Sequence, residues 1–151
     1  MMRIVLSSVL VLMCASFGSA QKLKKEDVVG FWKLKESGFY EGKKKEKKDF
    51  DNCLLMRNYT IREDGFAIYN RIEGSVGNCI PTEPSLSFWK IVDNRIQFYI
   101  NKDTIIDEVE VTLNSDKTIT FTSYIPQPIK DKDPNLEKML NTIYYDVLEA
   151  Y

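Results

Sequence analysis

The stretch Val-Val-Gly-Phe-Trp-Lys-Leu-Lys-Glu-Ser, residues 28–37, sets the fold class. In it Trp32 and Leu34 alternate with Lys33 and Lys35. Successive side chains of a β-strand point to opposite faces of the sheet, so this alternation indicates a strand with one buried face. We therefore predict that a sheet begins in this stretch.

The same alternation continues to Ile125 in short segments separated by turn-forming residues. Its apolar positions are Tyr59, Ile61, Phe66, Ile68, Leu86, Phe88, Ile96, Phe98, Ile100, Val109, Val111, Leu113, Ile119 and Phe121. Turns are expected at residues 63–65, where Gly65 supplies a positive φ, and at residues 93–94 and 114–117. Short strands joined by tight turns predict an antiparallel meander, and closure into a barrel would remove its exposed edges. The predicted fold class is all-β, an antiparallel up-and-down β-barrel.

The C-terminal segment has a different period. Its apolar residues fall at steps of three and four: Leu136, Met139, Leu140, Ile143, Tyr144, Val147, Leu148 and Tyr151. Asp133 is a suitable N-cap, and Pro134 suits the first helical turn. This pattern predicts an amphipathic helix over residues 134–150. We expect its apolar stripe to pack on the outside of the barrel; the alternative is a surface that recruits a partner.

The first twenty residues are predicted to be a secretory signal peptide. Arg3 gives a positive start, residues 4–15 form an apolar stretch, and Gly18-Ser19-Ala20 offers small residues for cleavage. An uncleaved anchor helix is the alternative, but the apolar run is shorter than the roughly 20 residues that a bilayer requires. A lipoprotein cleaved before Cys14 is another alternative, although Met13 is bulkier than such a site prefers.

Cleavage after Ala20 would leave one domain, residues 21–151, without a transmembrane segment. We expect it to be secreted, with a periplasmic or lipid-anchored location less favoured. Of the 21 basic and 22 acidic residues, only Arg3 would be removed, so the mature net charge is −2. That balance does not suggest a protein that binds nucleic acid.

Export also bears on the cysteines. Cys14 would leave with the signal peptide, and Cys53 and Cys79 would remain. In an oxidising compartment such a pair predicts one disulfide, which would stabilise the fold by roughly 3–4 kcal/mol. Two unpaired thiols are the alternative. Asn58-Tyr59-Thr60 is a glycosylation sequon, so Asn58 would be the acceptor if the source is a eukaryote.

Gly30-Phe31-Trp32 resembles the start of the first strand in the lipocalin and fatty-acid-binding superfamily, where Gly-x-Trp opens the barrel. The order of motifs that follows resembles the small secreted lipocalin-like domains of Bacteroidetes type. The matching pieces lie between about residues 27 and 123: Trp32, Asp51-Asn52-Cys53, residues 59–65, Cys79, Ser87-Phe88-Trp89 and the turn at residues 93–94. The chain departs from the pattern in carrying Ser87 where a Gly is usual, in its terminal helix, and in lacking the arginine motif near the closure of the barrel.

The resemblance implies a barrel of about eight strands, with Trp32 packed at its closed end, that carries a small ligand. The residues predicted to point inward are Leu34, Tyr59, Ile61, Phe66, Ile68, Phe88, Ile96, Phe98, Val109, Val111, Ile119 and Phe121. The candidate ligand-binding residues among them are Tyr59, Phe66, Ile68, Phe88, Phe98, Val111 and Phe121. A barrel of this size can be filled by side chains or can hold one small ligand, and the aromatic rings leave both options open.

The strongest charge feature is the run at residues 43–48, Lys-Lys-Lys-Glu-Lys-Lys. In lipocalins a long loop over the open mouth follows the first strand, so the resemblance would place Lys44, Lys45 and Lys47 at the entrance. There they could attract a carboxylate, a lipid head group or an anionic surface. The alternative is a solvated loop without a binding role.

Catalytic chemistry has little support. The chain has no His, its two mature cysteines are expected to be paired, and it has no Gly-rich phosphate loop or nucleophile elbow. Asp107 would lie on the strand face opposite Glu108 and Glu110, as at a solvated strand edge. We therefore expect a non-enzymatic protein without a cofactor or bound metal.

Two functions follow from these patterns. The first is a carrier of a small hydrophobic or amphipathic ligand, of fatty-acid or lipid type. The alternative is an interaction module with a filled barrel, which contacts a protein partner or a cell surface through its loops or C-terminal helix.

Overall fold

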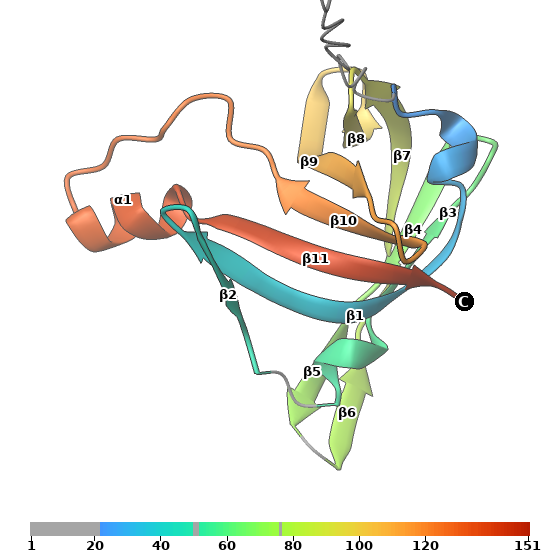
Figure 1. Ribbon diagram of the computed structural model, residues 1–151, viewed down its shortest axis with the longest axis horizontal. Coiled ribbons are helices and arrows are strands. Elements are labelled where there is room, and N and C mark those ends of the chain that lie inside the picture. Colours follow the sequence, from blue (N-terminus) through green and yellow to red (C-terminus); the bar gives the residue numbers. More distant parts are fainter. Residues whose placement is uncertain (1–21, 50–51, 76) are drawn as a thin grey trace, which may run out of the picture.

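A computed structural model describes residues 22–49, 52–75 and 77–151 (Figure 1). The predicted signal peptide lies outside the described residues. The strands are β1 (Gly30–Glu41), β2 (Lys44–Lys47), β3 (Asn58–Ile61), β4 (Phe66–Asn70), β5 (Ile72–Ser75), β6 (Asn78–Pro81), β7 (Ser85–Val92), β8 (Arg95–Asn101), β9 (Thr104–Leu113), β10 (Thr118–Ser123) and β11 (Ile143–Ala150). The helices are two single 3₁₀ turns, η1 (Lys25–Asp27) and η2 (Leu54–Met56), and the α-helix α1 (Pro134–Leu140).

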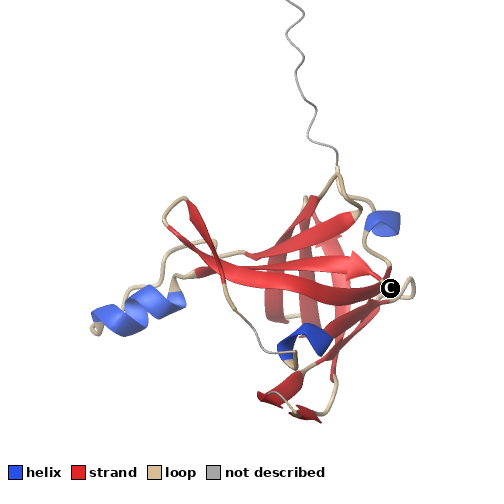
Figure 2. Ribbon diagram, turned by 60° about the horizontal axis from the view of Figure 1, so that its bottom comes forward, coloured by secondary structure: helices blue, strands red, loops and turns tan. Residues whose placement is uncertain are grey.

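Eight of the described strands form a closed antiparallel ring. Its order is β1, β3, β4, β7, β8, β9, β10 and β11, and β11 pairs back onto β1. β2 extends the sheet beside the second half of β1, and β5 and β6 form a separate hairpin. The predicted antiparallel, up-and-down arrangement is confirmed, and the closed ring is visible in Figure 2.

The turns at one end of the ring behave as the sequence predicts. Gly65 has φ +90°, and Asp93 and Lys117 have φ 57° and 65° in the turns that precede β8 and β10. These left-handed conformations reverse the chain within a few residues, which fits the right-handed twist of the paired strands. We call this end of the ring the closed end.

Apolar side chains fill the closed end. The core includes Trp32, Leu34 and Trp89, and their neighbours on the other strands are Ile61, Ile96, Phe98, Val109, Ile119, Phe121 and Leu148. The Trp32 Nε1–H donates to the carbonyl oxygen of Val28 at 2.7 Å. The Trp89 Nε1–H donates to the carbonyl oxygen of Arg62 at 2.8 Å. Both indole groups are therefore hydrogen-bonded within the core, and Trp32 has the predicted structural role.

The predicted inward set is correct for most strands. Tyr59 and Val111 pack partly buried against the core, and the fully buried members are Leu34, Ile61, Ile96, Phe98, Val109, Ile119 and Phe121.

The prediction is wrong for β4 and β7, because the inward residues there are Ala67, Ser87 and Trp89. Phe66 and Phe88 are 45% and 38% exposed, and their ring centroids lie 4.6 Å apart on the outer face. Ile68 has the same parity as Phe66, so it also faces outward.

The C-terminal prediction is wrong beyond Leu140. Residues 134–140 form α1, and the Asp133 side chain caps it by accepting from the Asn135 N–H at 2.9 Å. Residues 143–150 are the strand β11, which pairs with β1 and β10 and closes the ring. Both faces of β11 carry apolar side chains, because Leu148 lies in the core while Tyr145 is buried on the outer face under β2. Because both faces of the strand are covered, apolar and polar residues do not alternate along it, and the spacing of its apolar residues resembles that of a helix.

The expected packing of the helix on the barrel is also wrong. α1 has no buried residue, and Met139 is 57% exposed. The helix stands beside the end of β11, away from the barrel wall (Figures 1 and 2).

The predicted disulfide is confirmed: Cys53 and Cys79 are bonded across a separation of 26 residues. It joins the segment at η2 to β6, so it anchors the β5–β6 hairpin below the ring. No helix in the described part of the chain is long and apolar enough to cross a membrane.

Candidate ligand-binding site

The end of the barrel opposite the closed end, where β1 ends and β11 begins, is not filled by side chains. An inner cavity of about 160 Å³ lies among β3, β4, β7, β8 and β9. Its lining residues are Tyr59, Ala67, Tyr69, Ser85, Ser87, Phe98, Ile106 and Asp107. The cavity exists because β4 and β7 contribute small inward residues, Ala67, Ser85 and Ser87, where large apolar side chains would fill the space.

A second cavity, of about 120 Å³, adjoins the first and reaches the start of β11. Its residues are Tyr59, Asp107, Val109, Phe121, Ser123, Tyr144, Tyr145 and Asp146. Tyr59 and Asp107 line both cavities, so these two residues stand where the two spaces meet.

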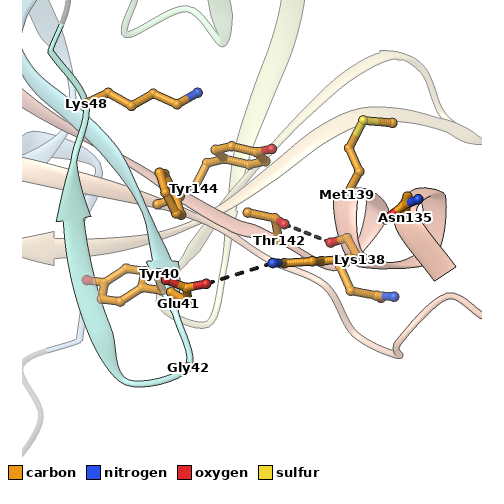
Figure 3. Close-up of a pocket in the computed structure, with 11 residues that line it drawn as sticks. Tyr40, Glu41, Gly42, Lys48, Asn135, Lys138, Met139, Thr142 and Tyr144 are labelled. Atoms are coloured by element: carbon orange, nitrogen blue, oxygen red, sulfur yellow. Dashed lines mark hydrogen bonds and ion pairs between the residues drawn. The ribbon is translucent and has the colours of Figure 1, made fainter.

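A rim groove of about 500 Å³ lies beyond the mouth, between the β1–β2 hairpin and α1 (Figure 3). Phe39, Tyr144 and Met139 give it an apolar lining, and Lys48 and Lys138 lie at its sides. Lys138 forms an ion pair with Glu41 at 3.8 Å across the groove. Tyr144 lines both the rim groove and the second cavity, so the apolar surface continues from the groove into the barrel.

Two carboxylates face the mouth. Burial raises the pKa of Asp107, and the neighbouring Asp146 carboxylate raises it further, while the Glu108 N–H lowers it by donating to Asp107 at 2.9 Å. Burial also raises the pKa of Asp146, against the lowering effects of the Ser37 hydroxyl and the positive charges of Arg57 and Lys48. The two acids therefore differ in the charges that act on them: the cations Arg57 and Lys48 lower the pKa of Asp146, whereas no cation is among the described groups that act on Asp107.

Tyr59 occupies the centre of the site. Its ring stacks on Tyr69 with a centroid distance of 4.4 Å, and it contacts Phe98 at 6.2 Å and Phe121 at 5.6 Å. Burial raises the pKa of the Tyr59 phenol well above its ordinary value. The Tyr59 side chain lines both cavities.

Of the predicted ligand-binding residues, Tyr59, Phe98 and Phe121 line these cavities. Val111 packs against the core below them. Phe66, Ile68 and Phe88 lie on the outer face and are not part of the site.

The predicted lysine entrance is wrong in its geometry. Residues 44–47 form β2, not a loop over the mouth. Lys45 and Lys47 each lie 3.6 Å from a Glu36 carboxylate oxygen, and Lys45 stacks on the Tyr145 ring at 4.1 Å. Glu36 and Tyr145 belong to the outer face, because the adjacent Ser37 and Asp146 face the mouth.

These outer-face residues form a charge-paired cluster. The Tyr145 hydroxyl donates to Glu36 at 3.0 Å, and burial together with this carboxylate raises the pKa of Tyr145 to about 12. Lys44 pairs with Glu46. Lys48, which follows β2, is the lysine of the run that faces the mouth, with its ammonium 5.4 Å from the centre of the Tyr144 ring.

Sequence reasoning missed Asp107 and Asp146 as site residues. Asp107 shares its parity with Val109 and Val111, which were predicted to point inward, so the alternation contained the signal for its position. Asp146 gave no such signal, because its segment has a helical period.

The predicted sequon residue Asn58 lies in β3, where its side-chain oxygen accepts from Asn70 Nδ2 at 2.7 Å. Glycosylation of Asn58 stays a prediction.

Within residues 22–49, 52–75 and 77–151, no group of three His, Cys, Asp or Glu side chains could hold a metal ion.

A model of a known protein family matches most of the barrel. The model of the lipocalin-like domain matches residues 28–121, which includes β1 to β9 and most of β10. The chain belongs to the lipocalin-like domain family. The family has a calycin-type fold suited to small-ligand binding, and its members generally bind ligands rather than catalyse reactions. No curated protein matches the chain. In this lipocalin-like chain, β11 lies beyond the matched region and completes the ring.

Proposed function

We propose that this chain is an exported, non-enzymatic protein that binds one small hydrophobic or amphipathic ligand at the open end of its barrel. The observation that carries the proposal is the inner cavity, which joins aromatic walls to small inward residues on β4 and β7. Ligand sites are typically concave and mostly apolar, with a few polar groups that fix orientation. The signal-like N-terminus and the disulfide support export.

The sizes of the spaces restrict the ligand. A cavity of about 150 Å³ is known to admit a single benzene ring, so the inner cavity, at about 160 Å³, has room for one ring and not for a long acyl chain. The rim groove, at about 500 Å³, could hold a further apolar portion against Phe39 and Tyr144. The proposed ligand is thus compact at its inner end, and a fatty acid would have to lie with its chain in the groove.

The interaction module remains the second candidate, and one observation favours it. Phe66, Leu86, Phe88 and Tyr99 gather on the outer face of β4, β7 and β8, with Phe66, Leu86 and Phe88 exposed. An exposed apolar cluster of this kind can mark a protein-binding surface.

Ligand-observed NMR with a one-ring probe tests the carrier proposal. We expect residues 21–151 to transfer saturation to 2-phenylethanol, and Ser87→Leu to abolish the transfer, because the added side chain fills the inner cavity. Lys90→Leu adds the same side chain to the exposed face of β7 and should leave the transfer intact. Thermal melts would confirm that both variants fold. The proposal fails if the wild-type chain transfers no saturation, or if both leucine variants behave alike.

A further inference from the structure

The charges of the mouth are unevenly distributed. Arg57 and Lys48 lower the pKa of Asp146, Arg57 also lowers that of Tyr69, and Arg57 donates to the Ile72 carbonyl at 3.4 Å. Asp107 is influenced instead by burial and by the Asp146 carboxylate. Asp107 keeps an exposed side towards solvent, but it lines both cavities, and no cation of the described chain is among the groups that act on it. A bound cation would supply the opposite charge that favours the ionised carboxylate.

The walls next to Asp107 are suited to a cation of a particular kind. Tyr59 and Tyr69 stack with their rings 23° from parallel, and Phe98 and Phe121 lie beside Tyr59. Aromatic faces attract cations, most strongly where water is excluded. Tyr59 and Asp107 line both cavities together, so the phenol group adds hydrogen-bonding capacity beside the carboxylate.

The inner end of the site is suited to an uncharged ring. Ala67, Ser87 and Phe98 line a space with room for one six-membered ring, and Ser85 and Ser87 offer hydroxyl groups to its substituents. The ring space and Asp107 adjoin, so one short molecule could occupy both.

From this geometry we propose that the ligand is a small organic monocation, a protonated amine carried on a short chain from a single ring. Its ring lies in the inner cavity and its ammonium group lies between Asp107 and Tyr59. This inference rests on the proposed function. The sequence led us to expect an anionic ligand group bound by lysines, whereas the proposed ligand carries a cation bound by the Asp107 carboxylate. Lys45 and Lys47 are already paired with Glu36 on the outer face, so they leave the mouth free for this ligand.

Calorimetric titration at neutral pH with three probes of matched shape tests the proposal: 2-phenylethylammonium, the neutral 2-phenylethanol, and the anion 3-phenylpropanoate. We expect the cation to bind about tenfold or more tightly than the neutral probe, because a hydrogen bond to a charged partner adds at least that much. The anion should bind most weakly, since its carboxylate would lie beside that of Asp107, on which no described cation acts.

Asp107→Asn keeps the size of the side chain and removes its charge, so it should abolish the preference for the cation, measured as the ratio of the affinities for 2-phenylethylammonium and 2-phenylethanol. Glu110→Gln removes an exposed carboxylate from the same strand and should retain the preference.

Asp107→Asn should also fold well. The native pKa of Asp107 is raised, so the native state holds its proton more tightly than the unfolded chain, and stability falls as pH rises from the unfolded pKa through the native one. At pH 7 the variant should therefore melt at or above the wild-type temperature, and near pH 3 this advantage should be absent.

The possible outcomes separate the two proposals. If 2-phenylethanol binds and the cation binds no more tightly, the small-ligand site stands and the cation proposal is overturned. The same holds if Asp107→Asn keeps the preference. If none of the three probes binds, both proposals are overturned.

Discussion

Replacing both Cys53 and Cys79 by Ala should lower the free energy of unfolding by about 3.5 kcal/mol, because the bond closes a loop of 26 residues and restricts the unfolded chain. Urea denaturation followed by tryptophan fluorescence measures this change, since Trp32 and Trp89 both lie in the core. Reduced wild-type protein provides the matched control and should lose a similar amount.

The expected loss is large for a domain of this size, whose total stability is of the order of 5–15 kcal/mol. A loss below about 1 kcal/mol would contradict the stabilising role given to the disulfide. Such a result would mean that the β5–β6 hairpin is held in place by its other contacts.

Leu148→Ala should destabilise the protein by about 2–5 kcal/mol, because Leu148 is fully buried where β11 closes the ring against β1 and β10. Leu140→Ala is the matched control, since Leu140 is 38% exposed on α1 and its truncation should cost little. Denaturant unfolding of both variants gives the comparison. Equal losses would contradict the burial of Leu148 at the closure of the ring.

Much of the fold could be predicted from patterns among residues that are neighbours in the sequence. The alternation in β1, β8 and β9 and the turns at residues 63–65, 93–94 and 114–117 depend on neighbouring residues, so the sequence displays them directly. The disulfide followed from the count of cysteines outside the predicted signal peptide.

The binding site was harder to predict, because it violates the rule that apolar residues face inward. On β4 and β7 the outer face carries Phe66, Leu86 and Phe88, whereas the inner face carries Ala67 and Ser87. A prediction from the alternation pattern takes the more apolar face of a strand as the interior. It therefore placed large aromatic side chains in a space that the structure leaves open. Small and polar inward residues are the requirement of a cavity, and they weaken the signal from which its position is inferred.

The C-terminal strand was hidden for a different reason. Tyr145 is covered by contacts with Glu36 and Lys45 that no local pattern contains, so a residue on the outer face is as buried as one in the core. This tertiary cover, and with it the position of Asp146, depends on the pairing of β11 with β1 across more than a hundred residues.

The position of a bound probe tests the central claim most directly. We expect 2-phenylethylammonium, added to residues 21–151 with ¹³C-labelled aromatic side chains, to shift the ring resonances of Tyr59 and Phe98 in the inner cavity. The rings of Phe66 and Phe88 on the outer face should not respond. Shifts centred on Phe66 and Phe88 would contradict a site inside the barrel and would favour the interaction module instead.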